Sequence, residues 1–226
     1  MVMLRTEGLA KRFVLHLQDG VRIPVLAGVD LAVRAGECLV LSGPSGSGKS
    51  TLLRALYGNY RADAGRILVR HGGATIDLAS ATPRDVLEVR TTTIGYVSQF
   101  LRVVPRVPAL AIVAEAAVGP NAIERARDLL HRLNIPARLH ALPPATFSGG
   151  EQQRVNLARG FIAARPILLL DEPTASLDAA NADIVVGMIR DAKARGTAIV
   201  GIFHDSAVRD AVADRVYEMR PLQDAA

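Results

Sequence analysis

The nine residues "GPSGSGKST", from Gly43 to Thr51, decide how the rest of this 226-residue chain is interpreted. They fit the phosphate-loop pattern G-x-x-x-x-G-K-[ST], and they lie between a strand-like run and a helix-like run, as the motif requires. The glycines let the backbone turn sharply and aim its N–H groups at phosphate oxygens, and the start of the helix adds a favourable dipole. The Lys49 side chain can reach the β- and γ-phosphates, and the Ser50 hydroxyl can bind Mg²⁺. The predicted phosphate-binding residues are Gly43, Pro44, Ser45, Gly46, Ser47, Gly48, Lys49, Ser50 and Thr51.

A second motif, "ILLLDEPTASLD" from Ile167 to Asp178, places two adjacent acids at the end of an apolar run. Four successive apolar residues are typical of a strand that is buried on both faces. At the end of this strand, Asp171 is a candidate for the Mg²⁺ shell, acting through water. Glu172 follows where an attacking water would lie, so it is the candidate general base for phosphate hydrolysis.

A third stretch, "TFSGGEQQRVNLARG", sets a serine and two glycines directly before a helix-like run. Ser148 and Glu151 fit the S-x-x-E capping box, which predicts a helix start at this point. Because a helix start presents free N–H groups and a positive dipole end, it also favours an anion. The chain therefore has a second candidate anion site, far along the sequence from its phosphate loop.

Strand-like and helix-like runs alternate along most of the chain, which predicts an α/β domain with a largely parallel sheet. The early chain, up to about Asp77, is richer in short strands and turns, and predicts an additional antiparallel sheet on one side. The expected strands are 38–41, 66–69, 94–97, 167–170 and 198–203, and the expected helices are 49–57, 123–133, 151–164 and 182–194.

The stretch from Phe100 to Thr146 breaks this alternation. It carries two Pro-containing turns around helical material and shows no clear strand, so we interpret it as a helical lobe inserted into the α/β core. The whole chain, 1–226, is then one nucleotide-binding domain. Its core comprises 1–99 and 147–226, while about 100–146 begins the helical subdomain that leads into a helix over 148–164.

The composition narrows the classes of partner. Lys plus Arg is 27 and Asp plus Glu is 22, so the net charge is +5, but the arginines are spread along the chain and Trp is absent. This favours a solvated surface over a nucleic-acid groove, so we expect no nucleic-acid partner. The single cysteine, Cys38, lies in an apolar run and is expected to be a buried thiol. No signal-like or membrane-spanning run is evident, which predicts a cytoplasmic protein.

The order and spacing of these motifs, with "YVSQF" around Gln99 and a late "FHD", resemble the nucleotide-binding domain of ABC ATPases. The resemblance implies ATP and Mg²⁺ as ligands and a dimer, with itself or with a sibling ATPase, in which each chain completes its partner's ATP site. Glu172, His204 and Gln99 would be catalytic, with Ser50, Gln99 and Asp171 at the metal. The remaining implied roles are contact with the partner's ATP for Ser148, Gly149, Gly150 and Glu151, the dimer interface for Ser176, Leu177 and Asp178, and adenine stacking for Phe13.

Several stretches narrow the resemblance further. "LRALYGNY", "YVSQFLRVVPRVPAL", "FSGGEQQRVNLARGFI" and "AIVGIFHD" resemble the L-type ATPases of the bacterial carbon–phosphorus lyase system. That resemblance implies lyase core subunits as partners and an accessory part in forming ribose 1-phosphonate 5-triphosphate from ATP and a phosphonate. Arg102 and Arg106 would face a soluble protein partner. The alternative is the ATP-binding subunit of an ABC membrane transporter with a permease partner, such as a lipoprotein-release exporter or a phosphonate importer.

Overall fold

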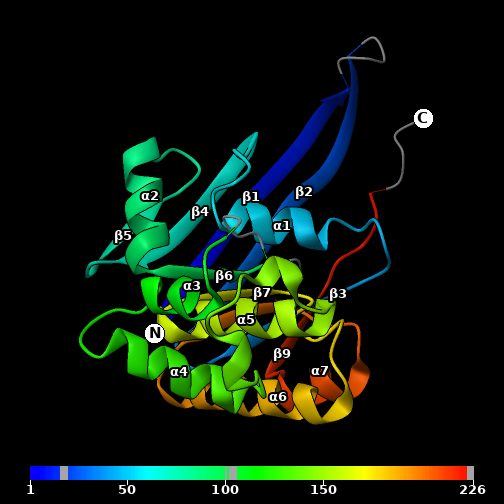
Figure 1. Cartoon of the computed structure of the whole chain (residues 1–226). Coiled ribbons are helices and arrows are strands. Elements are labelled where there is room, and N and C mark those ends of the chain that lie inside the picture. The colour runs from blue at the N-terminus through cyan, green and yellow to red at the C-terminus, as the bar shows by residue number, and fades with distance from the viewer. Residues whose placement is uncertain (16–19, 100, 102–105, 223–226) are drawn as a thin grey trace.

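The first third of the chain forms an antiparallel sheet with two long strands. The computed structural model describes residues 1–15, 20–99, 101 and 106–222. Within this range, β1 (Val2–Leu15) and β2 (Val21–Arg34) pair along most of their length, and β4 (Ala64–His71) and β5 (Ala74–Asp77) extend the sheet in the order β2-β1-β4-β5. Figure 1 shows this sheet on one side of the molecule, with α1 close to it. The antiparallel sheet expected from the sequence is confirmed.

The second sheet is parallel and has five strands in the order β6-β7-β8-β3-β9. Its strands are β3 (Cys38–Ser42), β6 (Ile94–Val97), β7 (Ile167–Asp171), β8 (Ala198–Ile202) and β9 (Arg215–Glu218). Strand β3 pairs with β8 and β9, which are far from β3 in the sequence, and β8 also pairs with β7. Because all these strands are parallel, the carboxyl ends of β3 and β7 lie at the same edge of the sheet. In open α/β sheets this edge is where ligands bind.

The parallel sheet is buried on both faces because its side chains alternate between two hydrophobic cores. In β7, Leu168 and Leu170 belong to one core, and Ile167 and Leu169 belong to the other. Period-2 alternation of side chains requires this division once both faces are covered. The uninterrupted apolar run that predicted a doubly buried strand is thus explained.

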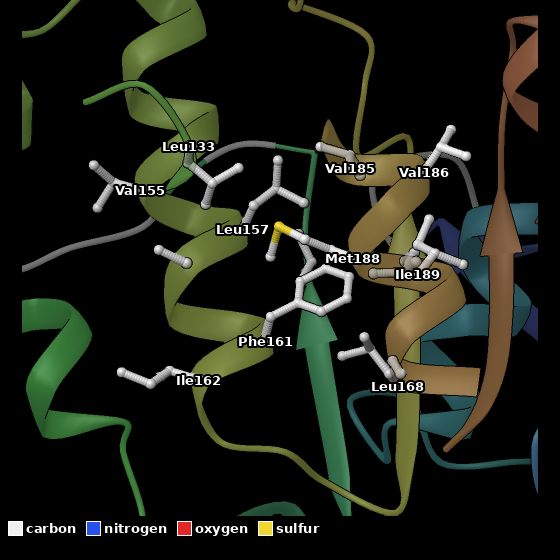
Figure 2. Packing of buried hydrophobic residues seen from close by; sticks show 14 of the residues in the cluster. Leu133, Val155, Leu157, Phe161, Ile162, Leu168, Val185, Val186, Met188 and Ile189 are labelled. Atoms are coloured by element: carbon white, nitrogen blue, oxygen red, sulfur yellow. The ribbon is translucent and has the colours of Figure 1, made fainter. Parts of the chain in front are cut away.

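One core lies between the parallel sheet and the helices α5 (Gly149–Ile162) and α6 (Ala179–Ala194). Figure 2 shows Leu157 and Phe161 of α5 pointing toward Met188 of α6. The other core lies between the two sheets and includes α1 (Lys49–Leu56), whose Leu52, Leu53 and Leu56 are fully buried. The helix that follows the phosphate loop is therefore fixed between two sheets.

Between β6 and α5, the elements among the described residues are all helices or 3₁₀ turns. They are α3 (Ala109–Glu115), α4 (Ala122–Arg132) and two short 3₁₀ turns, Ala137–Leu139 and Pro144–Thr146. Figure 1 shows α3 and α4 beside α5. The fold class, with its inserted helical part, is confirmed, while the exact subdomain limits remain a prediction. No helix among the described residues has both the length and the apolarity to span a bilayer.

Outside the predicted antiparallel sheet and helical lobe, sequence reasoning missed α2 (Pro83–Thr92), α7 (Ser206–Val212) and β9. Of these, α2 has a complete capping box, in which Thr82 and Asp85 bond reciprocally, followed by Pro83. That T-x-x-D signature was readable in the sequence. Strand β9 is short and largely exposed, and its pairing with β3 alone defines it, so its local sequence carries little signal.

Candidate functional site

The phosphate loop encloses a cavity at the carboxyl edge of the parallel sheet. The cavity has a volume of about 240 Å³ and is lined by Ser45–Thr51, together with Val25 of β2, Glu172 after β7 and His204 after β8. The loop leads from β3 into α1, whose N-cap, Gly48, makes no side-chain capping bond. The first N–H groups of α1 are thus left without a side-chain cap at the loop, where an anion can accept from them.

Two glycines of the loop are required by space as well as by conformation. A Cβ on Gly43 would overlap the carbonyl oxygen of Met219, and Gly43 has a φ of 141°. A Cβ on Gly48 would lie 2.8 Å from the carbonyl oxygen of Val25, and Gly48 has a φ of 90°. Both positions combine close backbone approach with a positive φ, which only glycine accepts without strain.

Two polar groups of the loop indicate how phosphate would fit. Lys49 Nζ donates to the carbonyl oxygens of Gly43 at 2.6 Å and of Pro44 at 2.9 Å, which keeps the ammonium at the loop. Ser47 Oγ is buried and has no hydrogen-bond partner among the described residues. Because a buried polar atom without a partner is costly, a phosphate oxygen or water within reach would satisfy it. The residues present thus fit a nucleotide phosphate chain.

Asp171, at the end of β7, accepts hydrogen bonds from the first turn of α1, which follows the phosphate loop, and from the neighbouring strand β6. Its buried carboxylate accepts from Ser50 Oγ at 3.1 Å and from the Tyr96 hydroxyl at 2.8 Å. Burial, followed by the nearby Asp171 charge, raises the pKa of Tyr96, so this phenol stays a proton donor. Tyr96 is a site residue that sequence reasoning missed, although it lies on β6 only three residues before Gln99.

A hydroxyl and a carboxylate at this spacing are the oxygen donors that Mg²⁺ prefers. Among the described residues, no three His, Cys, Asp or Glu side chains gather to hold a metal. Mg²⁺ commonly takes only one or two protein ligands and fills its shell with water and phosphate oxygens. The donor set of Ser50 and Asp171 therefore fits a magnesium ion that arrives with a nucleotide.

Glu172 is held between two side chains that come from distant parts of the chain. His204 Nε2 lies 2.6 Å from Glu172 Oε1, and Gln99 Nε2 donates to Glu172 Oε2 at 2.9 Å. Glu172 itself has a φ of 52°, an uncommon conformation for a residue with a side chain. Such local strain persists only where the surroundings fix it, and it concentrates at functional sites. The three candidate catalytic residues are thus brought together at the mouth of the cavity.

The second anion motif is folded as expected. Ser148 caps α5: its Oγ accepts from Glu151 N at 3.4 Å, and Glu151 Oε2 accepts from Ser148 N at 2.9 Å and from Ser148 Oγ at 2.7 Å. These bonds from Ser148 lower the pKa of Glu151. Gly149, Gly150 and Glu151 form the first turn of the helix, and this turn does not line the phosphate-loop cavity.

The turn formed by Ser148–Glu151, called the signature turn below, lies against the residues predicted at the dimer interface, Ser176–Asp178. A Cβ on Gly150 would lie 2.9 Å from the carbonyl oxygen of Ser176, so glycine is needed for this contact. After Leu177, Asp178 caps α6 by accepting from Asn181 N at 2.8 Å, and this bond lowers the pKa of Asp178. The two segments expected at a dimer interface therefore form one surface of the chain.

Other predicted residues lie apart from this cavity. Phe13 lines a different cavity of about 540 Å³ with Lys11 and Arg12, and its ring meets the Tyr60 ring edge-on at 5.2 Å between centroids. Its adenine-stacking role stays a prediction. Arg102 lies outside the described residues, and Arg106 is exposed. Cys38 is buried as expected, and burial raises the pKa of its thiol to about 12, which makes it unreactive.

The fold and this arrangement define a phosphate-loop ATPase, and comparison with known proteins identifies its family. The chain belongs to the family described as "ABC transporter", whose model matches residues 26–175. Its structure is similar to a solved dimeric structure of the ATP-binding cassette MJ0796 in a post-hydrolysis state bound to ADP and Pi. The superposition covers 97% of this chain and 95% of that chain, with a TM-score of 0.86 and 25% sequence identity. The predicted ABC ATPase fold is confirmed.

Two relatives illustrate the systems in which such chains occur. The lipoprotein-releasing system ATP-binding protein LolD of Shewanella frigidimarina is 40% identical over 197 residues, which is 84% of this chain and 80% of that protein. The macrolide export ATP-binding/permease protein MacB of Pectobacterium atrosepticum is 34% identical over 223 residues, which is 96% of this chain and 33% of that protein. These relatives support the transporter alternative better than the phosphonate lyase expectation, which they do not support.

Proposed function

We propose that this chain binds and hydrolyses ATP, with the site residues in the roles that the sequence predicted. The observation that carries the proposal is the position of the Glu172 carboxylate. It lies at the rim of the phosphate-loop cavity, between the Gln99 amide and the His204 imidazole. A general base within hydrogen-bond reach of an attacking water must occupy such a position.

In this proposal each group of the chain has a distinct task. The loop N–H groups and Lys49 hold the phosphates. Ser50, Gln99 and Asp171 would hold a magnesium ion, which would supply positive charge to offset that of the phosphates. Gln99 and Glu172 orient the attacking water, and Glu172 accepts its proton as the oxygen bonds to the γ-phosphorus and ADP leaves. His204 donates a hydrogen bond toward the γ-phosphate. Catalysis then rests on positioning and charge stabilisation.

We further propose that the working form is a dimer. The first turn of α5 follows Ser148 and includes Gly149 and Gly150; Ser148 and Gly149 are exposed, and none of the three lines the chain's own phosphate cavity. Such a turn can bind the γ-phosphate of ATP held by a second copy or by a sibling ATPase. The dimeric structure of the related cassette MJ0796 supports this arrangement.

The relatives favour an export system of the lipoprotein-release type as the assembly in which this ATPase works. In that case a membrane permease is the partner, and the chain acts on its cytoplasmic side. The names of the LolD and MacB relatives, which refer to lipoprotein release and to an ATP-binding/permease protein, support this candidate.

A second candidate is the accessory ATPase of the carbon–phosphorus lyase system, and a specific observation favours it. Transporter subunits usually have "ARAL" where this chain has Asn156 shortly before "ARGF". Here Asn156 Nδ2 donates to the carbonyl oxygen of Ser98 at 2.6 Å, next to Gln99, and a Cβ on Gly160 would overlap Val97 Cγ2. The departure from the transporter pattern therefore lies where α5 meets the segment that carries Gln99.

Affinity purification of the tagged chain, from its source cells grown with a phosphonate as the phosphorus source, separates the two candidates. The exporter candidate predicts that an integral membrane permease co-purifies, as identified by mass spectrometry. The lyase candidate predicts soluble lyase subunits and a growth defect on phosphonate when Glu172→Gln replaces the wild-type chain. Recovery of a permease with normal growth on phosphonate would reject the lyase candidate, and the opposite pattern would reject the exporter.

A further inference from the structure

Two buried amides on one face of α5 connect the two segments that carry Gln99 and Glu172. Gln153 and Asn156 are 4% and 5% exposed, which is unusual for such polar side chains. Being three residues apart on a helix, they are neighbours on the same face. Neither residue lines the phosphate-loop cavity, so the roles proposed above leave them unexplained.

The hydrogen bonds of these amides lead to the backbone on both sides of the site. Asn156 Nδ2 donates at 2.6 Å to the carbonyl oxygen of Ser98, the residue before Gln99. The same group lies 3.4 Å from Gln153 Oε1, and Gln153 Nε2 donates at 3.1 Å to the carbonyl oxygen of Pro173, the residue after Glu172. One continuous path thus runs from Ser98 through two side chains of α5 to Pro173.

This path reaches the part of the site that most needs support. Glu172 has a φ of 52°, and a strained conformation persists only where neighbouring contacts over-determine it. Glu172 N donates to the carbonyl oxygen of Ile202 at 3.1 Å, and the Gln153 bond fixes the next residue. Gln99 is restrained in the same way through Ser98, so both members of the Gln99–Glu172 pair are held from α5.

The helix that carries these amides begins at Ser148, the residue proposed to contact the partner's ATP. Its approach to β6 is close, because Gly160 leaves no room for a Cβ beside Val97. A displacement of α5 would therefore move the backbone at Ser98 and Pro173 directly. Buried polar networks that are fully bonded specify one arrangement of the groups that they join.

We propose that Asn156 and Gln153 are positioning residues, which hold Gln99 and Glu172 in register and couple that pair to the signature end of α5. They touch neither the nucleotide nor the attacking water. The proposal rests on the proposed ATPase function, since the pair must be the hydrolytic one for its position to affect turnover.

Asn156→Ala is the direct test, because it removes the amide, and alanine is the most favourable residue in a helix interior. We expect kcat to fall about tenfold, since small displacements of catalytic groups cost this much or more. The KM for ATP should be unchanged, because the phosphate loop is untouched. Without nucleotide, amide hydrogen exchange in a peptide covering 94–99 should quicken by about threefold or more, as expected for a segment that has lost a tether.

The double variant Asn156→Ala/Gln99→Ala tests whether the effect passes through Gln99. We expect it to be no slower than Gln99→Ala alone, since residues that act as one unit are not additive. Gln153→Met, which keeps the length but removes the donor, should reproduce the loss of kcat. Thr6→Val is the matched control, because buried Thr6 bonds Val29 and Leu31 in the antiparallel sheet. It should lower the melting temperature without changing kcat.

Unchanged kcat and exchange in Asn156→Ala would overturn the proposal, as would losses that add fully to those of Gln99→Ala. If Thr6→Val lost as much kcat as Asn156→Ala for the same fall in melting temperature, the loss would reflect general stability, and the proposal would also be overturned. If the wild-type chain itself, with a candidate partner, showed no ATP hydrolysis, the proposed function would fail instead. The exchange measurement, made without ATP, distinguishes the two failures.

Discussion

Glu172→Gln is expected to abolish hydrolysis while leaving ATP binding intact. Glutamine has the same size and can still bond to Gln99 and His204, but it cannot accept a proton from water. We expect kcat to fall by about 1,000-fold, within the range that a general base contributes. Single-turnover hydrolysis of radiolabelled ATP, together with equilibrium binding of ATP, measures both quantities.

Because ATP would persist in this variant, the ATP-bound dimer should accumulate and be visible by size-exclusion chromatography with light scattering. Glu124→Gln is the control, since Glu124 is an exposed acid in the first turn of α4. It should behave as the wild-type chain does. Turnover near the wild-type rate in Glu172→Gln would remove Glu172 from the role of base.

Lys49→Ala is expected to remove most of the affinity for ATP. The ammonium lies at the loop, where it bonds the carbonyl oxygens of Gly43 and Pro44, and a phosphate chain entering the cavity would come within its reach. A hydrogen bond to a charged group contributes about 1.5–3 kcal/mol, so we expect the Kd for ATP to rise by about 10- to 100-fold. Isothermal titration calorimetry with Mg²⁺-ATP measures this change.

Lys193→Ala controls for the loss of a positive charge. Lys193 bonds Asp214 at 2.7 Å and the Val212 carbonyl oxygen, and it takes no part in lining the phosphate cavity. Its ATP affinity should match that of the wild-type chain. Equal losses in the two lysine variants would mean that overall charge, and not the loop ammonium, governs ATP binding.

Much of the fold was predictable because local pattern and tertiary structure agree. The apolar runs of β3, β7 and β8 are buried on both faces, and each strand extends within one residue of its expected range. The capping box at Ser148 placed the start of α5 correctly. In contrast, β9 is exposed and exists only through its pairing with β3, so the chain around it shows no period that could reveal it.

The site was predictable as a set of residues but not as a geometry. Gln99 and Glu172 are 73 positions apart, and neither local sequence indicates that their side chains form a hydrogen bond. The positive φ of Glu172 and the burial of Gln153 also depend on the assembled chain. The bond from Asn156 to Ser98 also required the structure, because the two residues are 58 positions apart.

The central claim is that each ATP site is completed by a second chain, and mixing two inactive variants tests it most directly. At an ATP concentration well below its raised Kd, Lys49→Ala should bind little ATP, and Ser148→Glu should place a carboxylate where the partner's γ-phosphate must lie. In a mixed dimer one site combines both lesions, while the other has an intact loop and an intact signature turn. Random pairing makes about half of the dimers mixed, each with one intact site of two, so we expect about a quarter of the wild-type rate. If Ser148→Glu alone hydrolysed ATP at the wild-type rate, or if mixing restored nothing, the composite site would be contradicted.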